Sequence, residues 1–116
     1  MSAEPNQEPT EAILRELYVL LEERKNADPE TSYTARLYSK GVKKIAQKLG
    51  EEAVEAAIAA VAESKEHLVR ESADLLYHLL VLWSARGIEP SEVWAELDRR
   101  FGTSGLAVKE ARKKSG

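Results

Sequence analysis

The sequence predicts an all-α protein, an antiparallel helical bundle of about four to five helices that is completed by dimerisation. The 116 residues are rich in helix formers and include only 4 prolines and 6 glycines. Apolar residues recur at intervals of three and four along several stretches, which is the spacing of one helix face. Proline and glycine separate these stretches, so each one indicates a separate helix.

The composition narrows the classes of function. With 43% hydrophobic and 32% charged residues the chain is expected to be globular. The absence of cysteine excludes disulfides and thiolate metal sites and favours a cytoplasmic location. A net charge of -3 gives no general attraction to nucleic acid, and no apolar run approaches the roughly 20 residues that span a bilayer. We therefore expect a small-molecule ligand, with neither nucleic acid nor a membrane as partner.

The chain divides into three segments. Residues 1–9 are polar and contain two prolines, so we expect a disordered N-terminal lead-in. Residues 10–102 form the all-α domain, and residues 103–116 form a basic C-terminal tail.

Local signals place the shorter helices. Thr10 is a suitable N-cap for a first helix, which ends before Pro29. Ser32 can cap a short helix that runs to about residue 40, where Gly41 allows a break. Pro90 begins a last helix that ends at residue 102. The first and last helices each carry an apolar stripe that one hairpin does not fully cover, which predicts a homodimer.

A helical hairpin is predicted at the centre of the chain. Residues 42–62 carry a wide apolar arc, polar residues 63–66 form the turn, and a second apolar stretch ends at Gly87. The arc of the first helix consists of Ile45, Ala46, Leu49, Ala53, Val54, Ala57, Ile58 and Val61. Gly50 lies inside this helix at a cost of about 1 kcal/mol relative to alanine, and we expect it to allow close approach of another backbone.

Four carboxylates occupy matched positions on this hairpin. Glu52 and Glu55 are three residues apart on one helix, and Glu71 and Asp74 are three apart on the other, so each pair shares a helix face. Residues equally distant from a turn at about residue 63 face each other, which pairs Glu52 with Asp74 and Glu55 with Glu71. Paired acids usually form a solvated face. Here they interrupt otherwise apolar faces, which favours a functional site.

Four carboxylates this close together repel one another unless a cation lies among them. Mg²⁺ prefers oxygen ligands and keeps positions for water or phosphate, so we predict a magnesium site. His67 and His78 share the face of Glu71 and Asp74, and an alternative makes them ligands of a di-iron or zinc site. The spacing disfavours this alternative, because such bundles use Glu-x-x-His and no acid lies three residues before either histidine. We expect each histidine to pack or to form hydrogen bonds.

The residues beside the acids leave several roles open. Lys44 and Lys48 precede the acids, and Lys48 either pairs with Glu52 one turn later or binds substrate phosphates. Three roles are open for Glu51: a further metal ligand, a base next to the metal, or an acid on the surface.

The acids match a known pattern. Residues 51–55 (EEAVE) followed by residues 71–74 (ESAD) resemble the E-E-x-x-E and E-x-x-D signature of the all-α nucleoside triphosphate pyrophosphohydrolases. Within that superfamily the chain is most similar to the phosphoribosyl-ATP pyrophosphatase family. The similarity is carried by residues 32–34 (SYT), 44–52 (KIAQKLGEE), 74–82 (DLLYHLLVL) and 102–105 (GTSG), with Lys109 and Arg112. It departs from the family at Ala107 and Val108, where the tail is often acidic.

The resemblance implies a magnesium-dependent hydrolase that acts as a homodimer and releases pyrophosphate from phosphoribosyl-ATP in histidine biosynthesis. Glu52, Glu55, Glu71 and Asp74 are the expected metal ligands, Glu51 the expected water-orienting base, and Lys44 and Lys48 the candidates for nucleotide binding. Two alternatives stay open. One is a house-cleaning enzyme that hydrolyses several nucleoside triphosphates, and the other is a non-catalytic helical dimerisation module.

Overall fold

The computed structural model describes residues 8–101, which contain five helices and no strand. They are α1 (Ala12–Arg24), α2 (Tyr33–Lys40), α3 (Val42–Ala62), α4 (Lys65–Ala85) and α5 (Pro90–Phe101). The predicted all-α class is therefore confirmed. Residues 1–7 of the expected lead-in and the whole expected tail, 103–116, lie outside the described residues. No helix between residues 8 and 101 is long and apolar enough to cross a membrane.

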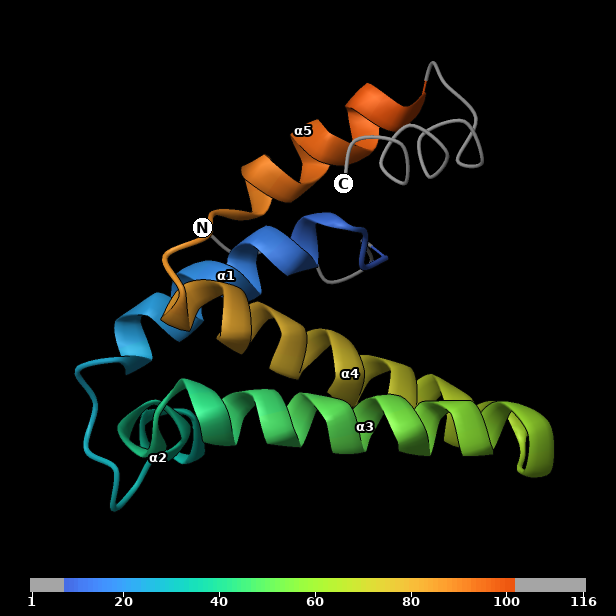
Figure 1. Ribbon diagram of the computed structural model, residues 1–116, viewed down its shortest axis with the longest axis horizontal. Helices are drawn as coiled ribbons and strands as arrows, with labels where there is room; N and C mark the ends of the chain where they lie inside the picture. Colours follow the sequence, from blue (N-terminus) through green and yellow to red (C-terminus); the bar gives the residue numbers. More distant parts are fainter. Residues whose placement is uncertain (1–7, 102–116) are drawn as a thin grey trace, which may run out of the picture.

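Two long helices, α3 and α4, form the predicted hairpin and lie side by side along the molecule (Figure 1). Only Glu63 and Ser64 separate them, so the turn lies where it was expected but is shorter, since Lys65 and Glu66 already belong to α4. The Ser64 hydroxyl accepts a hydrogen bond of 3.1 Å from the backbone N–H of His67 and caps α4. Ser32 caps α2 in the same way through the N–H of Ala35, also at 3.1 Å. At Gly41 the chain turns from α2 into α3 with φ of 92°, a conformation that glycine adopts without steric cost.

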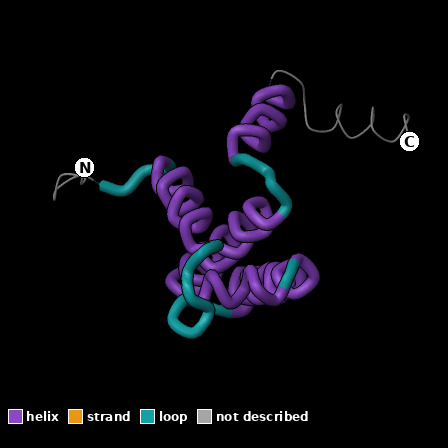
Figure 2. The backbone as a smooth tube through the Cα atoms, turned by 90° about the vertical axis from the view of Figure 1, so that its left-hand side faces the viewer, coloured by secondary structure: helices purple, strands orange, loops and turns teal. Residues whose placement is uncertain are grey.

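The core lies where α1 and α2 pack against the hairpin, away from its turn (Figure 1). It consists of Tyr18, Leu21, Leu37, Ile45, Leu80 and Val81, all at most 4% exposed. The Tyr18 hydroxyl donates a hydrogen bond of 2.8 Å to the carbonyl of Ile88 and ties α1 to the segment after α4. The last helix, α5, projects from this body (Figure 2) and contacts it through the edge-to-face pair of Trp83 and Trp94, whose centroids are 5.9 Å apart.

A polar network joins α1, α2 and α4 beside the core. The hydroxyl of Ser84 is 1% exposed; it accepts a hydrogen bond of 2.7 Å from Tyr38 and donates one to Glu22. Lys25 pairs with Glu22 at 3.1 Å and donates to the Ser84 carbonyl at 3.0 Å. Every buried polar atom in this group thus has a partner, which keeps the cost of its burial low.

The apolar arc of α3 is mostly left uncovered by residues 8–101. Of the α3 residues only Ile45 and Ala59 are buried. Five exposed residues, Ala46, Gly50, Val54, Ala57 and Val61, follow one another at intervals of three and four and form what we call the α3 stripe. The expected close approach at Gly50 is wrong within residues 8–101, since a Cβ there would meet no atom within 4 Å.

Candidate metal centre

The hairpin brings three of the four predicted acids together. Glu52 and Glu55 from α3 and Glu71 from α4 each offer a carboxylate oxygen, and these oxygens lie within 4.8 Å of one another. Glu52 and Glu71 are half-buried between the helices, whereas Glu55 is exposed at their edge. An all-oxygen set of this size suits a hard divalent cation such as Mg²⁺.

Asp74 lies outside this group of three and is exposed on α4. It is still close enough to act electrostatically on Glu52. Burial raises the pKa of the Glu52 carboxyl, and the charges of Asp74, Glu55 and Glu71 raise it further, against the opposing effect of His78. In the metal-free protein, the ionised form of Glu52 is therefore electrostatically unfavourable, as expected where several carboxylates lie close together.

One carboxylate oxygen of Glu71 is buried without a hydrogen-bond donor from residues 8–101. Its Oε2 lies 3.3 Å from Nε2 of His67, which also contacts Glu63 at 2.9 Å. Its Oε1 is buried and has no hydrogen-bond partner among residues 8–101. A buried carboxylate oxygen without a donor is costly, and a coordinated cation would remove that cost. The donor set and this orphaned oxygen therefore fit a magnesium ion.

Glu51 directly precedes Glu52, whereas Lys48 lies about one turn and Lys44 about two turns before it on α3. Glu51 is exposed, accepts a hydrogen bond of 3.0 Å from Gln47, and pairs with Lys48 at 3.5 Å. The Gln47 hydrogen bond and the lysine charges outweigh burial and lower the pKa of Glu51. Lys48 thus pairs with Glu51 rather than with Glu52, the partner suggested by the spacing. Lys44 and Lys48 are half-buried.

His78 is 5% exposed and forms hydrogen bonds through both ring nitrogens. Nδ1 lies 2.8 Å from the backbone carbonyl of Asp74, an acceptor only, so this nitrogen carries the proton. Nε2 lies 3.1 Å from the hydroxyl of Tyr33 and accepts a hydrogen bond from it. With both nitrogens engaged, neither is free for a metal. The expected hydrogen-bonding role of His78 is confirmed, and the di-iron and zinc alternative loses one of its two histidines.

Aromatic side chains next to the acids were not assigned to the site from the sequence. The rings of Tyr33 and Tyr77 stack at 6.4 Å, and His78 meets Tyr77 edge-to-face at 5.2 Å. Burial raises the pKa of Tyr33, Lys48 opposes this shift, and Tyr77 and Glu52 add to it, which places the phenol beside the charged groups of α3. The sequences Ser32-Tyr33-Thr34 and Tyr77-His78 could have indicated these residues. No spacing rule, however, predicts that residues 33 and 77 lie side by side.

The fold and this site define a class of protein: an all-α chain whose central hairpin gathers carboxylates between its helices, the arrangement expected of the all-α pyrophosphohydrolases. Comparison with known proteins gives the family. The family model described as Phosphoribosyl-ATP pyrophosphohydrolase matches residues 14–101. The chain belongs to this family and is a hydrolase.

Curated relatives named phosphoribosyl-ATP pyrophosphatase support the assignment. The protein of Paramagnetospirillum magneticum is 60% identical over 102 residues, covering 88% of this chain and 94% of that protein. The protein of Azospirillum brasilense is 59% identical, covering 88% and 92%. The protein of Rhodospirillum rubrum is 56% identical over 106 residues, covering 91% of each.

Proposed function

We propose that this protein hydrolyses phosphoribosyl-ATP to phosphoribosyl-AMP and pyrophosphate, a step of histidine biosynthesis, in the cytoplasm. The family match over residues 14–101 carries the proposal. In the overall reaction one water is consumed and the anhydride bond between the α- and β-phosphates is broken. The acid cluster and the neighbouring lysines supply the two needs of such a reaction, namely a place for a cation and positive charge for a polyphosphate.

Glu52, Glu55 and Glu71 would hold Mg²⁺, with Asp74 as the fourth acid. When bound, the ion supplies charge neutralisation at the phosphates and lowers the pKa of a coordinated water. The orphaned Oε1 of Glu71 is the observation that most favours this part of the proposal. The acids themselves repel the polyphosphate, so without a cation they would oppose substrate binding.

Glu51, Lys44 and Lys48 complete the proposed site. Glu51 is exposed next to Glu52 in the sequence and is the residue proposed to orient the attacking water. Lys48 is already within 3.5 Å of Glu51, and a phosphate could take that carboxylate's place as its partner. Lys44 lies one turn earlier on the same helix and extends the positive charge along the polyphosphate.

The active form is proposed to be a homodimer. The α3 stripe exposes Val54 to 59% and Val61 to 87%, although both are apolar. Leu97 and Phe101 of α5 are exposed to 54% and 92%. Exposed apolar residues in such numbers mark a protein interface in soluble proteins. A second copy of the chain would cover them.

Pyrophosphate release from three substrates tests the function. The protein with magnesium should cleave phosphoribosyl-ATP with a kcat/KM far above that for ATP or dUTP. Comparable values for a plain triphosphate would instead indicate the house-cleaning alternative. No pyrophosphate from any substrate would indicate a non-catalytic dimerisation module.

A further inference from the structure

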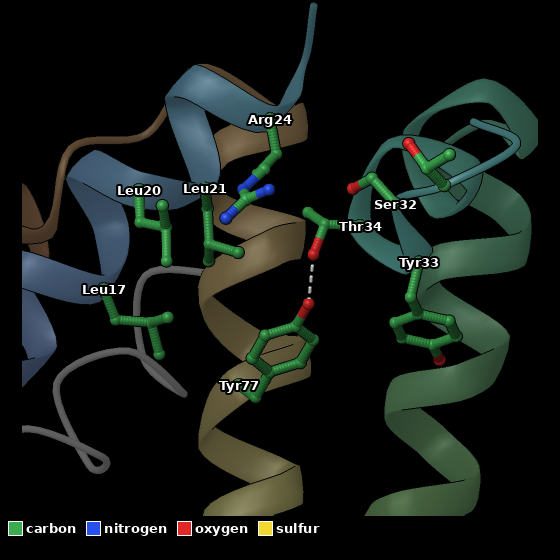
Figure 3. A pocket seen from close by; sticks show the side chains of 9 residues that line it. Leu17, Leu20, Leu21, Arg24, Ser32, Tyr33, Thr34 and Tyr77 are labelled. Carbon is green, nitrogen blue, oxygen red and sulfur yellow. Dashed lines mark hydrogen bonds between the residues drawn. The ribbon is translucent and has the colours of Figure 1, made fainter. Parts of the chain in front are cut away.

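A cavity of about 240 Å³ lies between α1, α2 and α4, and none of the four predicted acids lines it (Figure 3). Leu17, Leu20 and Leu21 of α1 form one wall, and residues 31–34 at the start of α2 form the other. Tyr77 of α4 lies between the two walls. Pockets for whole small ligands have volumes of roughly 300–1,000 Å³, so this cavity suits one part of a larger ligand.

The aromatic side of the cavity is held in a fixed position. The hydroxyl of Tyr77 forms a hydrogen bond with the buried Thr34 hydroxyl (Figure 3). Tyr33, stacked on Tyr77, is itself held by its hydrogen bond to His78. Aromatic rings held in place in this way, opposite an aliphatic wall, are suited to stack against a planar base.

Arg24 supplies positive charge at the edge of the same cavity. Its side chain extends over Leu21 into the space between α1 and the Thr34–Tyr77 pair (Figure 3). Arg24 is exposed, and its guanidinium group carries five N–H donors. Guanidinium groups bind phosphate in a two-pronged geometry.

The cavity lies within reach of a nucleotide bound at the acids. Tyr77 is three residues beyond Asp74 on α4, a rise of about 4.5 Å along the helix. Tyr33 connects the two regions, since its hydroxyl is fixed by His78 and its electrostatic neighbours include Lys48 and Glu52. A triphosphate at the acids would thus direct its base towards Tyr77.

We infer that this cavity is the subsite for the purine and for the additional phosphoribosyl group, the part that distinguishes phosphoribosyl-ATP from ATP. The purine packs against Tyr77, opposite the leucines of α1, and Arg24 pairs with the phosphate of the additional phosphoribosyl group. The inference rests on the proposed function, because only a substrate with a second phosphorylated sugar uses Arg24. According to this inference, α1 and α2 determine substrate specificity, and α3 and α4 bind the metal.

Product binding tests the subsite without requiring turnover. Calorimetry should measure phosphoribosyl-AMP and AMP binding to the full chain and to Arg24→Gln, with Arg15→Gln, an exposed arginine on the same helix, as the matched control. Arg24→Gln should weaken phosphoribosyl-AMP binding by about tenfold or more and bring it close to AMP binding. Arg15→Gln should leave both affinities unchanged. Equal losses for both ligands, or none in Arg24→Gln, would overturn the inference.

The role of Tyr77 is tested by the binding of phosphoribosyl-AMP and AMP to two variants. Tyr77→Phe keeps the ring and should retain most affinity for both ligands, whereas Tyr77→Leu should weaken binding of both.

In Arg24→Gln the ratio of kcat/KM for phosphoribosyl-ATP to that for ATP should fall about tenfold. If the unaltered protein does not cleave phosphoribosyl-ATP, the proposed function fails. If it cleaves this substrate and the ratio in Arg24→Gln is unchanged, only the subsite fails.

Discussion

At the residue scale, the Oε1 atom of Glu71 indicates that the site needs a cation. It is buried and accepts no hydrogen bond from residues 8–101, while burial and the other acids raise the pKa of the neighbouring Glu52 carboxyl. The metal-free protein therefore retains unfavourable electrostatic energy at one place on the hairpin. Binding a cation would remove it.

Charge removal at Glu52 should separate metal binding from folding. Glu52→Gln keeps the shape of the side chain and removes one repelling charge, so the Tm without magnesium should stay the same or rise slightly. The Tm increase produced by magnesium should be lost, because that increase reflects binding to the folded state. Activity should fall by orders of magnitude.

Asp74→Asn should have the same effects to a smaller degree, since Asp74 is exposed and lies outside the group of three. Glu66→Gln, an exposed acid on the same helix, is the control and should behave like the unaltered protein in scanning fluorimetry and pyrophosphate release. A Glu52→Gln protein with normal turnover and a normal response to magnesium would place these acids on a solvated face.

Glu22 gives a prediction for acidic pH. Burial acts to raise its pKa, but the hydrogen bonds from Ser84 and Lys25 outweigh burial and the pKa lies below the ordinary value of 4.5. A carboxyl whose pKa falls on folding stabilises the protein above the unfolded-state pKa, and this contribution is lost as pH falls through the folded-state pKa. Glu22→Gln should therefore lose less stability than the unaltered protein between about pH 5 and about pH 3.

Urea unfolding midpoints across this pH range measure the effect of Glu22. Glu23→Gln, at the exposed neighbouring position, is the matched control and should show the pH dependence of the unaltered protein. Parallel curves for Glu22→Gln and the unaltered protein would contradict the role given to the Ser84 and Lys25 hydrogen bonds.

At the scale of elements, the start of α4 is specified by the cap at Ser64. Replacing Ser64 with Ala removes the side-chain acceptor for the His67 N–H and should lower the free energy of unfolding by about 1 kcal/mol. Ser64→Asp retains an acceptor and should restore most of that loss. Chemical unfolding of the three proteins gives the comparison, and equal stabilities would show that the cap does not contribute.

The bounds of the elements were predictable wherever a local signal marks them. Ser32 and Ser64 cap their helices, Gly41 separates α2 from α3, and the two-residue turn sets the register of the acids. The Tyr33–His78 hydrogen bond was not predictable, because it joins residues 45 positions apart and no spacing rule connects them. The cavity at Arg24 depends in the same way on how α1 packs against α4.

At the scale of the whole molecule, apolar periodicity shows which face of α3 is apolar but not which chain covers it. The periodicity predicted a wide apolar arc on residues 42–62, and the α3 stripe on this helix is exposed among residues 8–101. Gly50 lies within the stripe and, with no atom of residues 8–101 near it, leaves room there for the backbone of a second helix. The sequence could not distinguish burial within one chain from burial between two.

A charge in the α3 stripe should disrupt the proposed dimer. Val54→Lys places an ammonium group at the centre of the stripe, where covering it would leave a buried charge without a partner. Light scattering at micromolar concentration should find a dimer for the unaltered protein and a monomer for Val54→Lys. Asn26→Lys, at an exposed polar position after α1, is the control and should remain dimeric. A monomeric, fully active unaltered protein would contradict the proposal.

The two-residue turn between α3 and α4 also has an evolutionary consequence. Because it closes the hairpin locally, all four acids are contained in residues 52–74, whereas the cavity at Tyr77 needs α1 and α2 as well. If α1 and α2 select the nucleotide as inferred, they can diverge without moving the carboxylates. A chimaera that takes residues 10–40 from a relative with another nucleotide preference should acquire that preference and keep its magnesium-dependent melting; loss of both properties together would show that the two parts do not vary independently.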